Sequence, residues 1–178
     1  MKRAGVTRGA LYHHFDSKEG LFVAVCEEAE QGLVERVAIA AVSAPDPLAA
    51  LRRGSEEFLD AVTDPALQRI LLVDAPAVLG WERWREMEAR YGLGLVTEAL
   101  RAAMEAGLMA PAPVEPLGHM LLAALNEAAL VVAGAADTKR ARAEVGQVVD
   151  HIIEALAGPG PPGAGRAAGG TTTPLQTR

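Results

Sequence analysis

The residues GVTRGALYHHFDSKE, numbers 5–19, combine a turn with the start of an amphipathic helix. Gly5 and Val6 suit a tight turn, and the Thr7 hydroxyl can accept a hydrogen bond from a free backbone N–H at a helix N-terminus. Leu11 and Phe15 are four residues apart, so they share one face of the helix. The pattern therefore predicts a turn, a capped helix and an apolar face that packs inward.

The other face of this predicted helix is polar. Arg8, Tyr12 and His13 offer hydrogen bonds and a positive charge rather than core contacts. In a helix-turn-helix unit, the helix after the turn enters the major groove of DNA while the earlier helix crosses the backbone. The stretch has the pattern of the second half of such a unit.

A longer run, AGVTRGALYHHFDSKEGLF, closely resembles the recognition helix and following linker helix of the TetR family of bacterial transcriptional regulators. It shares the turn glycine, the capping threonine, a Leu-Tyr-x-His-Phe core and a Ser-Lys-Glu start to the next helix. The resemblance implies an all-α fold, with a partial helix-turn-helix tip and a helical body for ligand binding and dimerisation. It implies a DNA-binding regulator, most simply a repressor, that is controlled by a small-molecule effector.

The resemblance also assigns DNA contacts by position. Arg8 and Tyr12 are expected at base edges, and the other three at phosphates. The predicted set is Thr7, Arg8, Tyr12, His13 and Lys18. Residues 1–15 carry three basic side chains and no acid, whereas the whole chain has a net charge of −6, so the N-terminal region is the part that DNA phosphates would attract.

The N-terminal region is short for a member of this family. Family members carry a first helix and most of a second before the turn, but only Met1 to Ala4 precede Gly5. We therefore expect an incomplete DNA-binding domain and keep two interpretations. In the first, the true start lies upstream of Met1. In the second, the chain is a helical, dimeric ligand- or partner-binding protein that has lost operator binding.

The composition favours helices throughout the remaining residues. Half of the residues are hydrophobic but only 4% are aromatic, so alanine and leucine must supply the core. Apolar residues recur at helical spacing from the Asp16 region to about Val42, with Asp16 as the expected cap and Glu19 completing a capping box. Asp46-Pro47 and Asp64-Pro65 each predict a helix start, and Asp137-Thr138 is expected to cap the last helix.

Further along the chain, Asp74-Ala75-Pro76 is expected to interrupt the helix that begins at Asp64-Pro65. A polar helix follows over residues 81–106, and its Gly92 and Gly94 allow a bend or a close helix contact. We divide the chain into a partial helix-turn-helix region (1–22), a helical body (23–157) and a disordered Gly/Pro-rich tail (158–178). Ten of the last 21 residues are glycine or proline, which leaves the tail no means of forming a core.

Two strongly apolar helices are predicted at 117–133 and 138–157. Their apolar surface exceeds what one small protomer readily covers, and the simplest solution is a homodimer that pairs both helices in a four-helix bundle. The alternative is that both helices close a monomeric core. The stretch 120–136 is interrupted by polar residues and is too short to cross a bilayer, so we expect a soluble, cytoplasmic protein without a membrane anchor.

We find no catalytic or metal-binding constellation in the sequence. Phosphate loops, nucleophile elbows and clustered metal ligands are all missing, and the four histidines are scattered, so we expect neither enzyme activity nor a cofactor or metal. The single cysteine, Cys26, lies in an apolar run and is expected to pack in the core. The predicted effector contacts are polar or aromatic residues on apolar helices: Trp81, Trp84, Tyr91, His119, Met120 and Asn126, with Phe58 and Arg69 as weaker candidates.

Overall fold

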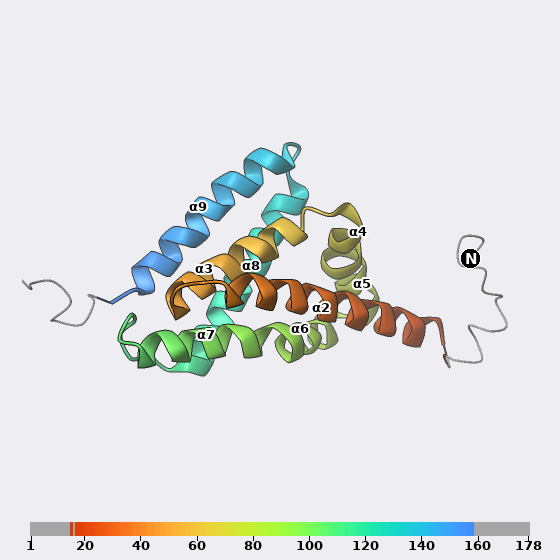
Figure 1. The fold of residues 1–178 in the computed structure, drawn as a ribbon. Helices are drawn as coiled ribbons and strands as arrows, with labels where there is room; N and C mark the ends of the chain where they lie inside the picture. The colour runs from red at the N-terminus through yellow and green to blue at the C-terminus, as the bar shows by residue number, and fades with distance from the viewer. Residues whose placement is uncertain (1–14, 16, 159–178) are drawn as a thin grey trace, which may run out of the picture.

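The computed structural model describes residue 15 and residues 17–158, and its elements are all helical (Figure 1). They are α2 (Lys18–Val42), α3 (Pro47–Ala61), α4 (Pro65–Gln68), the π-helix η1 (Arg69–Asp74), α5 (Ala75–Leu79), α6 (Trp81–Glu88), the π-helix η2 (Ala89–Leu93), α7 (Gly94–Glu105), α8 (Val114–Gly134) and α9 (Thr138–Leu156). The all-α prediction is confirmed. The β-type pairing within this range is an isolated bridge between Met109 and Ala157.

Aspartate residues cap the N-termini of three helices, as the sequence predicts. Asp46 accepts a hydrogen bond from the Ala49 N–H at 2.8 Å, Asp64 one from Ala66 at 2.8 Å, and Asp137 one from Arg140 at 3.0 Å. These bonds satisfy N–H groups that have no partner inside the helix.

The cap of α2 differs from the prediction. Ser17, not Asp16, is the N-cap residue, with extended backbone and its Oγ accepting from the Gly20 N–H at 2.9 Å. The expected end of this helix near Val42 is confirmed. Because α2 runs without a break from Lys18, it also crosses the domain boundary that we placed at residue 22.

The predicted interruption at Asp74-Ala75-Pro76 is wrong. The backbone stays helical from α4 through η1 into α5, because η1 adopts the wider π-helical register and Pro76 falls in the first turn of α5. Proline is tolerated there because the first turn of a helix does not need its N–H group. In the π-helical register, the Ala75 N–H bonds to the carbonyl of Ile70, five residues earlier.

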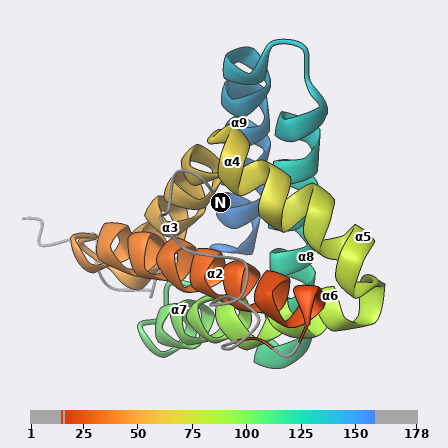
Figure 2. The same ribbon diagram turned by 90° about the vertical axis from the view of Figure 1, so that its right-hand side faces the viewer.

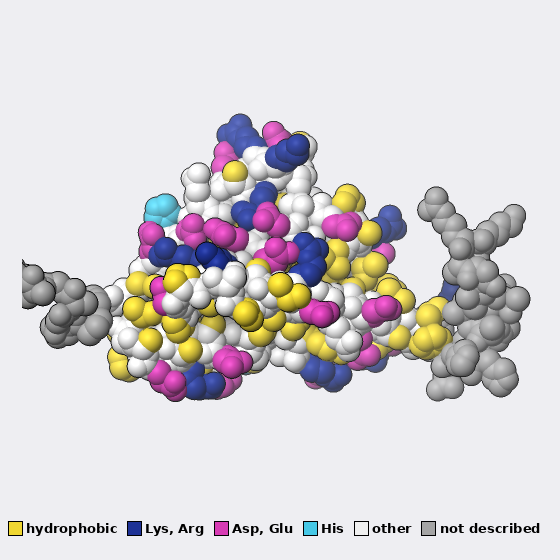
Figure 3. Space-filling model, in the orientation of Figure 1, with side chains coloured by type: hydrophobic (Ala, Val, Ile, Leu, Met, Phe, Trp, Pro, Cys, Tyr) yellow, Lys and Arg dark blue, Asp and Glu magenta, His cyan; other side chains and the backbone are white. Residues whose placement is uncertain are grey.

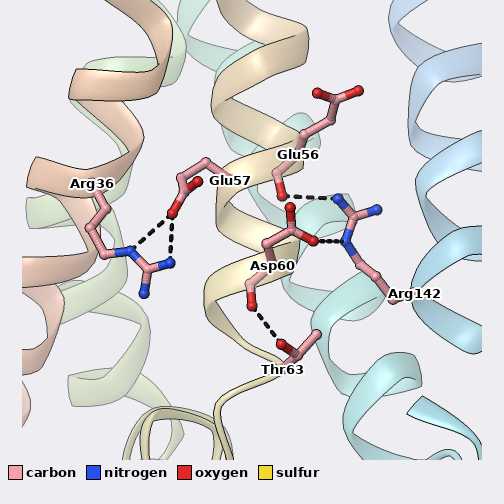
Figure 4. Close-up of polar contacts among 6 residues, drawn as sticks. All are labelled: Arg36, Glu56, Glu57, Asp60, Thr63 and Arg142. Atoms are coloured by element: carbon pink, nitrogen blue, oxygen red, sulfur yellow. Dashed lines mark hydrogen bonds and ion pairs between the residues drawn. The ribbon is translucent and has the colours of Figure 1, made fainter. Parts of the chain in front are cut away.

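Helix α3 lies at the centre of the body, between α2 on one side and α9 on the other (Figures 2 and 4). Arg36 of α2 pairs with Glu57 at 2.6 Å, and Arg142 of α9 pairs with Asp60 at 2.7 Å. Arg142 also donates to the Glu56 carbonyl oxygen at 3.1 Å. Basic and acidic side chains accordingly intermingle over this part of the surface (Figure 3). Acids on both sides of α3 thus connect it to both neighbours.

The apolar core follows the same arrangement. Leu59 of α3, Leu100 of α7 and Ile153 of α9 are completely or almost completely buried in the largest cluster. A second cluster joins α2, α5 and α6 through Cys26, Trp84 and neighbouring residues. Cys26 has no exposed surface, which confirms its predicted packing role.

Glycine permits helix α8 to approach its neighbours closely in two places. A Cβ atom at Gly118 of α8 would lie 2.5 Å from the Thr97 methyl carbon of α7, and one at Gly92 would lie 3.2 Å from Leu122 of α8. The close contact expected near Gly92 is therefore present. The Gly107 backbone has a φ of +69°, which glycine adopts without strain, at the end of α7.

Candidate functional site

A partly open cavity of about 120 Å³ lies in the body and is lined by α2, α3, both π-helices, the end of α6, α7 and α8. Its walls are mainly aliphatic, with Phe58 as their aromatic member. Four lining residues are polar: Glu30, Ser55, Glu88 and Asn126. Ser55 donates its hydroxyl to the Leu51 carbonyl within its own helix at 2.9 Å, so the three remaining side chains give the cavity its polar character.

Glu88 and Asn126 form a polar contact across the cavity wall. The Asn126 Nδ2 donates to Glu88 Oε2 at 2.8 Å, which joins the end of α6 to the middle of α8. Only 8% of the Glu88 surface is exposed. Burial raises the pKa of Glu88 to about 8; the nearby Glu30 carboxyl adds to this rise and Arg85 opposes it.

Glu30 is the second buried acid of the cavity. Only 7% of its surface is exposed, and it has no hydrogen-bond or ion-pair partner within residues 17–158. Burial raises the pKa of its carboxyl to about 7. Because transferring an unpaired charge into an apolar interior is costly, Glu30 and Glu88 retain protons at a pH where exposed glutamates are fully ionised.

Local sequence explains why both acids face inward. Cys26, Glu30, Leu33 and Val37 recur at spacings of three and four residues, so Glu30 lies on the buried face of α2. Glu88 is the last residue of α6, where the helix widens into η2. Single π-helical turns often occur at functional sites, and both π-helices of this chain contribute to the cavity wall.

Comparison with known proteins identifies the family. A family model described as "Tetracyclin repressor-like, C-terminal domain" matches residues 48–156, more than half of the chain. The chain belongs to the TetR family. A second TetR model, "Bacterial regulatory proteins, tetR family", matches residues 1–25, which include all five predicted DNA contacts. The resemblance inferred from the sequence is confirmed.

Two relatives extend this result. A TetR-family transcriptional regulator from Pectobacterium atrosepticum superposes with a TM-score of 0.77 at 29% identity, covering 88% of this chain and 80% of that one. The A-factor receptor protein of Streptomyces griseus is 26% identical over 168 residues. That match covers 90% of this chain but 55% of the relative, so the chain spans about half the length of that curated protein.

Of the six predicted effector contacts in this TetR body, Asn126 lines the cavity and the other five do not. Trp84 is buried in the core, and its Nε1 donates to the Leu71 carbonyl at 3.0 Å. Tyr91 packs against the same cluster. Trp81 is 62% exposed and lies against the Trp84 ring, with centroids 4.9 Å apart.

The two remaining candidates of the six are on the surface of α8. His119 is exposed, and Met120 is 71% exposed. Among the weaker candidates, Phe58 lines the cavity, whereas Arg69 is exposed and pairs with Asp74 at 3.3 Å. The structure therefore does not bring the predicted set together at one site.

Sequence reasoning missed Glu30 and Glu88, the two acids of the cavity. A signal was present in α2, because Glu30 interrupts an apolar stripe four residues after Cys26 and three before Leu33. An acid on the buried face of a helix requires either a partner or a function. The prediction instead favoured polar or aromatic residues on apolar helices, and large aromatic side chains commonly fill cores.

Most of the predicted TetR DNA contacts lie outside the described residues, namely Thr7, Arg8, Tyr12 and His13. Lys18 is described. It is the first residue of α2, directly after the Ser17 cap, and its side chain is exposed. These assignments stay predictions, as does the disordered tail, because residues 159–178 are also outside the described range.

Proposed function

We propose that this chain is a DNA-binding transcriptional regulator, acting as a repressor, whose operator binding is controlled by a small molecule in the cavity. The observation that carries the proposal is an internal cavity with two buried acids in the body that matches the TetR C-terminal model. The N-terminal match over residues 1–25 supports the DNA-binding part. Neither model describes an enzyme, in line with a regulatory role.

Helix α2 provides the connection between the two activities. Glu30 lies on the cavity wall near the middle of this helix, and residues 1–17 precede its first turn. Polar contacts hold α2 along the α6–η2 segment: Glu19 pairs with Arg83 at 2.5 Å, and Glu27 with Arg90 at 3.5 Å. A ligand that moves Glu88 relative to Glu30 would therefore shift α2. It changes operator affinity if it favours one arrangement of α2 in free energy.

We further propose a homodimer through the predicted helices 117–133 and 138–157, which correspond to α8 and α9. The two helices form an antiparallel hairpin with an apolar groove between them (Figure 1). Large apolar residues remain exposed along this groove: Val131 is 50% exposed, Val148 59% and Ile152 39%. An apolar surface of this kind marks an association site, and a two-fold axis would bring two such hairpins together as four helices.

The expectation that this apolar stretch is too short to cross a bilayer is wrong, because α8 (Val114–Gly134) is long and apolar enough to span a membrane by length and composition. Its buried side packs against α7 and α9, and its exposed apolar residues border the proposed dimer surface. These contacts favour a soluble protein over a membrane anchor. We place the protein in the cytoplasm, where a regulator meets its DNA.

The direct test is fluorescence anisotropy with the full chain and labelled DNA from the region upstream of its own coding sequence, over a range of salt concentrations. We expect specific binding that weakens as salt rises, because phosphate contacts release counterions. Arg8→Ala should reduce affinity about tenfold or more. Lys139→Ala, an exposed change on α9, should leave it unchanged. Equal affinity for unrelated DNA, or an unaffected Arg8→Ala variant, would contradict the proposal.

A further inference from the structure

We propose that the cavity binds a hydrophobic organic cation, such as a protonated amine, whose charge is held between Glu30 and Glu88 while its hydrocarbon part contacts the aliphatic walls. This inference rests on the proposed effector-controlled function and specifies the chemical class of the effector. It is drawn from the charge, burial and hydrogen bonding of the cavity walls.

The first argument is the balance of charge. Two carboxyl groups line the cavity, and no lysine, arginine or histidine is among its described lining residues. The basic residue that acts on Glu88 is Arg85, which is exposed on α6. Burial is the cause of the raised Glu30 pKa. The charged groups that act on Cys26, one helical turn before Glu30, are Glu30, Asp74 and Glu27, and all three are acids. A ligand cation would therefore provide the positive partner that the described lining residues do not supply.

The second argument is the number of unused hydrogen-bond acceptors. Glu88 accepts one bond from Asn126 through Oε2, and its Oε1 has no described partner. Glu30 is more than nine-tenths buried, lines the cavity and has no partner within residues 17–158. Ionised carboxylates only accept hydrogen bonds, whereas an ammonium group offers three donors and no acceptor. The empty acceptors thus match the donors of a protonated amine.

The third argument is exclusion of other ligand classes. An anion would meet two acids and no basic side chain among the described lining residues, and a purely apolar molecule would leave Glu30 without a partner. The remaining walls, formed by residues such as Leu33, Val37, Phe58 and Leu125, require a hydrocarbon part. A neutral molecule with hydroxyl groups is the competing class, and the experiment below is designed to separate it from a cation.

Binding of a cation should also release protons from Glu30 and Glu88. Burial raises the pKa of both Glu30 and Glu88, so each favours its neutral form when the cavity is empty. A bound cation favours the ionised form, and binding must then release protons. Ser55 on α3 and Asn126 on α8 do not titrate, while the pKa of Cys26 is raised to about 11. Affinity should therefore increase as the pH rises from 6 to 8, through the pKa values of these two carboxyls.

The experiment is isothermal titration calorimetry of the full chain with 2-phenylethylamine and with 2-phenylethanol, which have similar shape but differ in charge. We expect the amine to bind at least tenfold more tightly at pH 8, and its affinity to increase from pH 6 to 8. Buffers with different ionisation heats should reveal proton release. Equal affinity for the two probes would overturn the proposal and favour a neutral effector. Failure of both probes to bind would also overturn it.

Matched variants locate the binding site. Glu30→Gln and Glu88→Gln should each reduce amine affinity at least tenfold, whereas Glu35→Gln, an exposed change on the same helix as Glu30, should not. Glutamine resembles the protonated carboxyl, so both variants should fold, and circular dichroism checks this. An unchanged affinity in both cavity variants would exclude the site. Promoter binding is measured separately, so a chain that binds DNA but ignores the amine fails this inference alone.

Discussion

The Trp84 indole N–H donates to the backbone carbonyl of Leu71 at 3.0 Å, in the interior of the protein. Leu71 lies in η1, where the π-helical register directs each carbonyl to the N–H five residues later. For Leu71 that residue is Pro76, which has no N–H to donate. Trp84 therefore satisfies an acceptor that the proline leaves free, and it connects α6 to η1.

We predict from this contact that Trp84→Phe lowers the free energy of unfolding by about 1–3 kcal/mol, because the buried Leu71 carbonyl loses its donor. Urea unfolding followed by circular dichroism measures the change. Trp81→Phe is the control, since Trp81 is largely exposed and should alter stability much less. Equal effects of the two substitutions would show that the hydrogen bond does not stabilise η1.

A second prediction concerns the contact between α7 and α8 at Gly118. The Thr97 hydroxyl donates toward the carbonyls of Leu93 at 2.9 Å and Gly94 at 3.1 Å, so its methyl group cannot rotate away without losing these bonds. Gly118→Ala would place a Cβ against that methyl group and should cost about 1–3 kcal/mol in thermal or chemical unfolding.

Gly94→Ala is the matched control for this substitution. Gly94 lies in a regular helical conformation, and a Cβ there meets nothing within 4 Å. Alanine should stabilise the helix at this position by about 0.5–1 kcal/mol. If Gly118→Ala were as stable as the wild type, the helices would have to be separated more widely than the structure shows.

The buried acids also predict how stability depends on pH. The pKa values of Glu30 and Glu88 rise from their ordinary 4.5 to about 7 and about 8 in the folded protein. Between pH 4.5 and 8 the folded state therefore binds more protons than the unfolded chain, and the free energy of unfolding should fall as the pH rises. Each proton of difference contributes about 1.4 kcal/mol per pH unit.

The test is urea unfolding of wild type, Glu30→Gln and Glu88→Gln between pH 5 and 8. Both variants should show a weaker decline than the wild type and should be more stable than it at pH 8. Glu35→Gln should retain the wild-type slope because this side chain is exposed. Parallel pH curves for all four proteins would mean that the two carboxyls ionise normally.

The proposed dimer predicts that Val148→Glu yields a monomer in light scattering at micromolar concentration, because the charge would fall in the apolar groove of α8 and α9. Ile39→Glu is the control. Ile39 is 67% exposed on α2, away from the groove, and its substitution should leave the dimer intact. A monomeric wild type would refute the dimer, and a dimeric Val148→Glu would place the interface elsewhere.

The sequence was sufficient to predict the helical fold and most helix boundaries. Capping aspartates, prolines at helix starts and apolar spacing are local signals, and Asp46, Asp64 and Asp137 act as expected. The continuous backbone through Pro76 was missed because it depends on a π-helical register and on a donor from Trp84, thirteen residues from its acceptor. No local pattern contains that information.

The cavity was harder to predict than the fold. Asn126 was identified because an amide on an apolar helix is conspicuous, but its partner Glu88 lies 38 residues away in a polar segment. The walls combine residues from five separate parts of the chain, and only packing shows that Glu30 and Glu88 face the same space. Aromatic residues were poor guides because Trp84 and Tyr91 pack in the second core cluster.

Because α2 is one continuous helix, a small rotation near the cavity displaces its distant N-terminal turn. The helix contains 25 residues, and Lys18 is about 18 Å from Glu30 along its axis at 1.5 Å per residue. If the helix pivots near Glu30 by about 5°, its first turn is displaced by roughly 1.5 Å. In the proposed dimer the two α2 helices would move symmetrically, so the distance between their first turns would change by roughly 3 Å. In the proposed regulator, a change in one buried contact would thereby alter the spacing between the two DNA-binding regions.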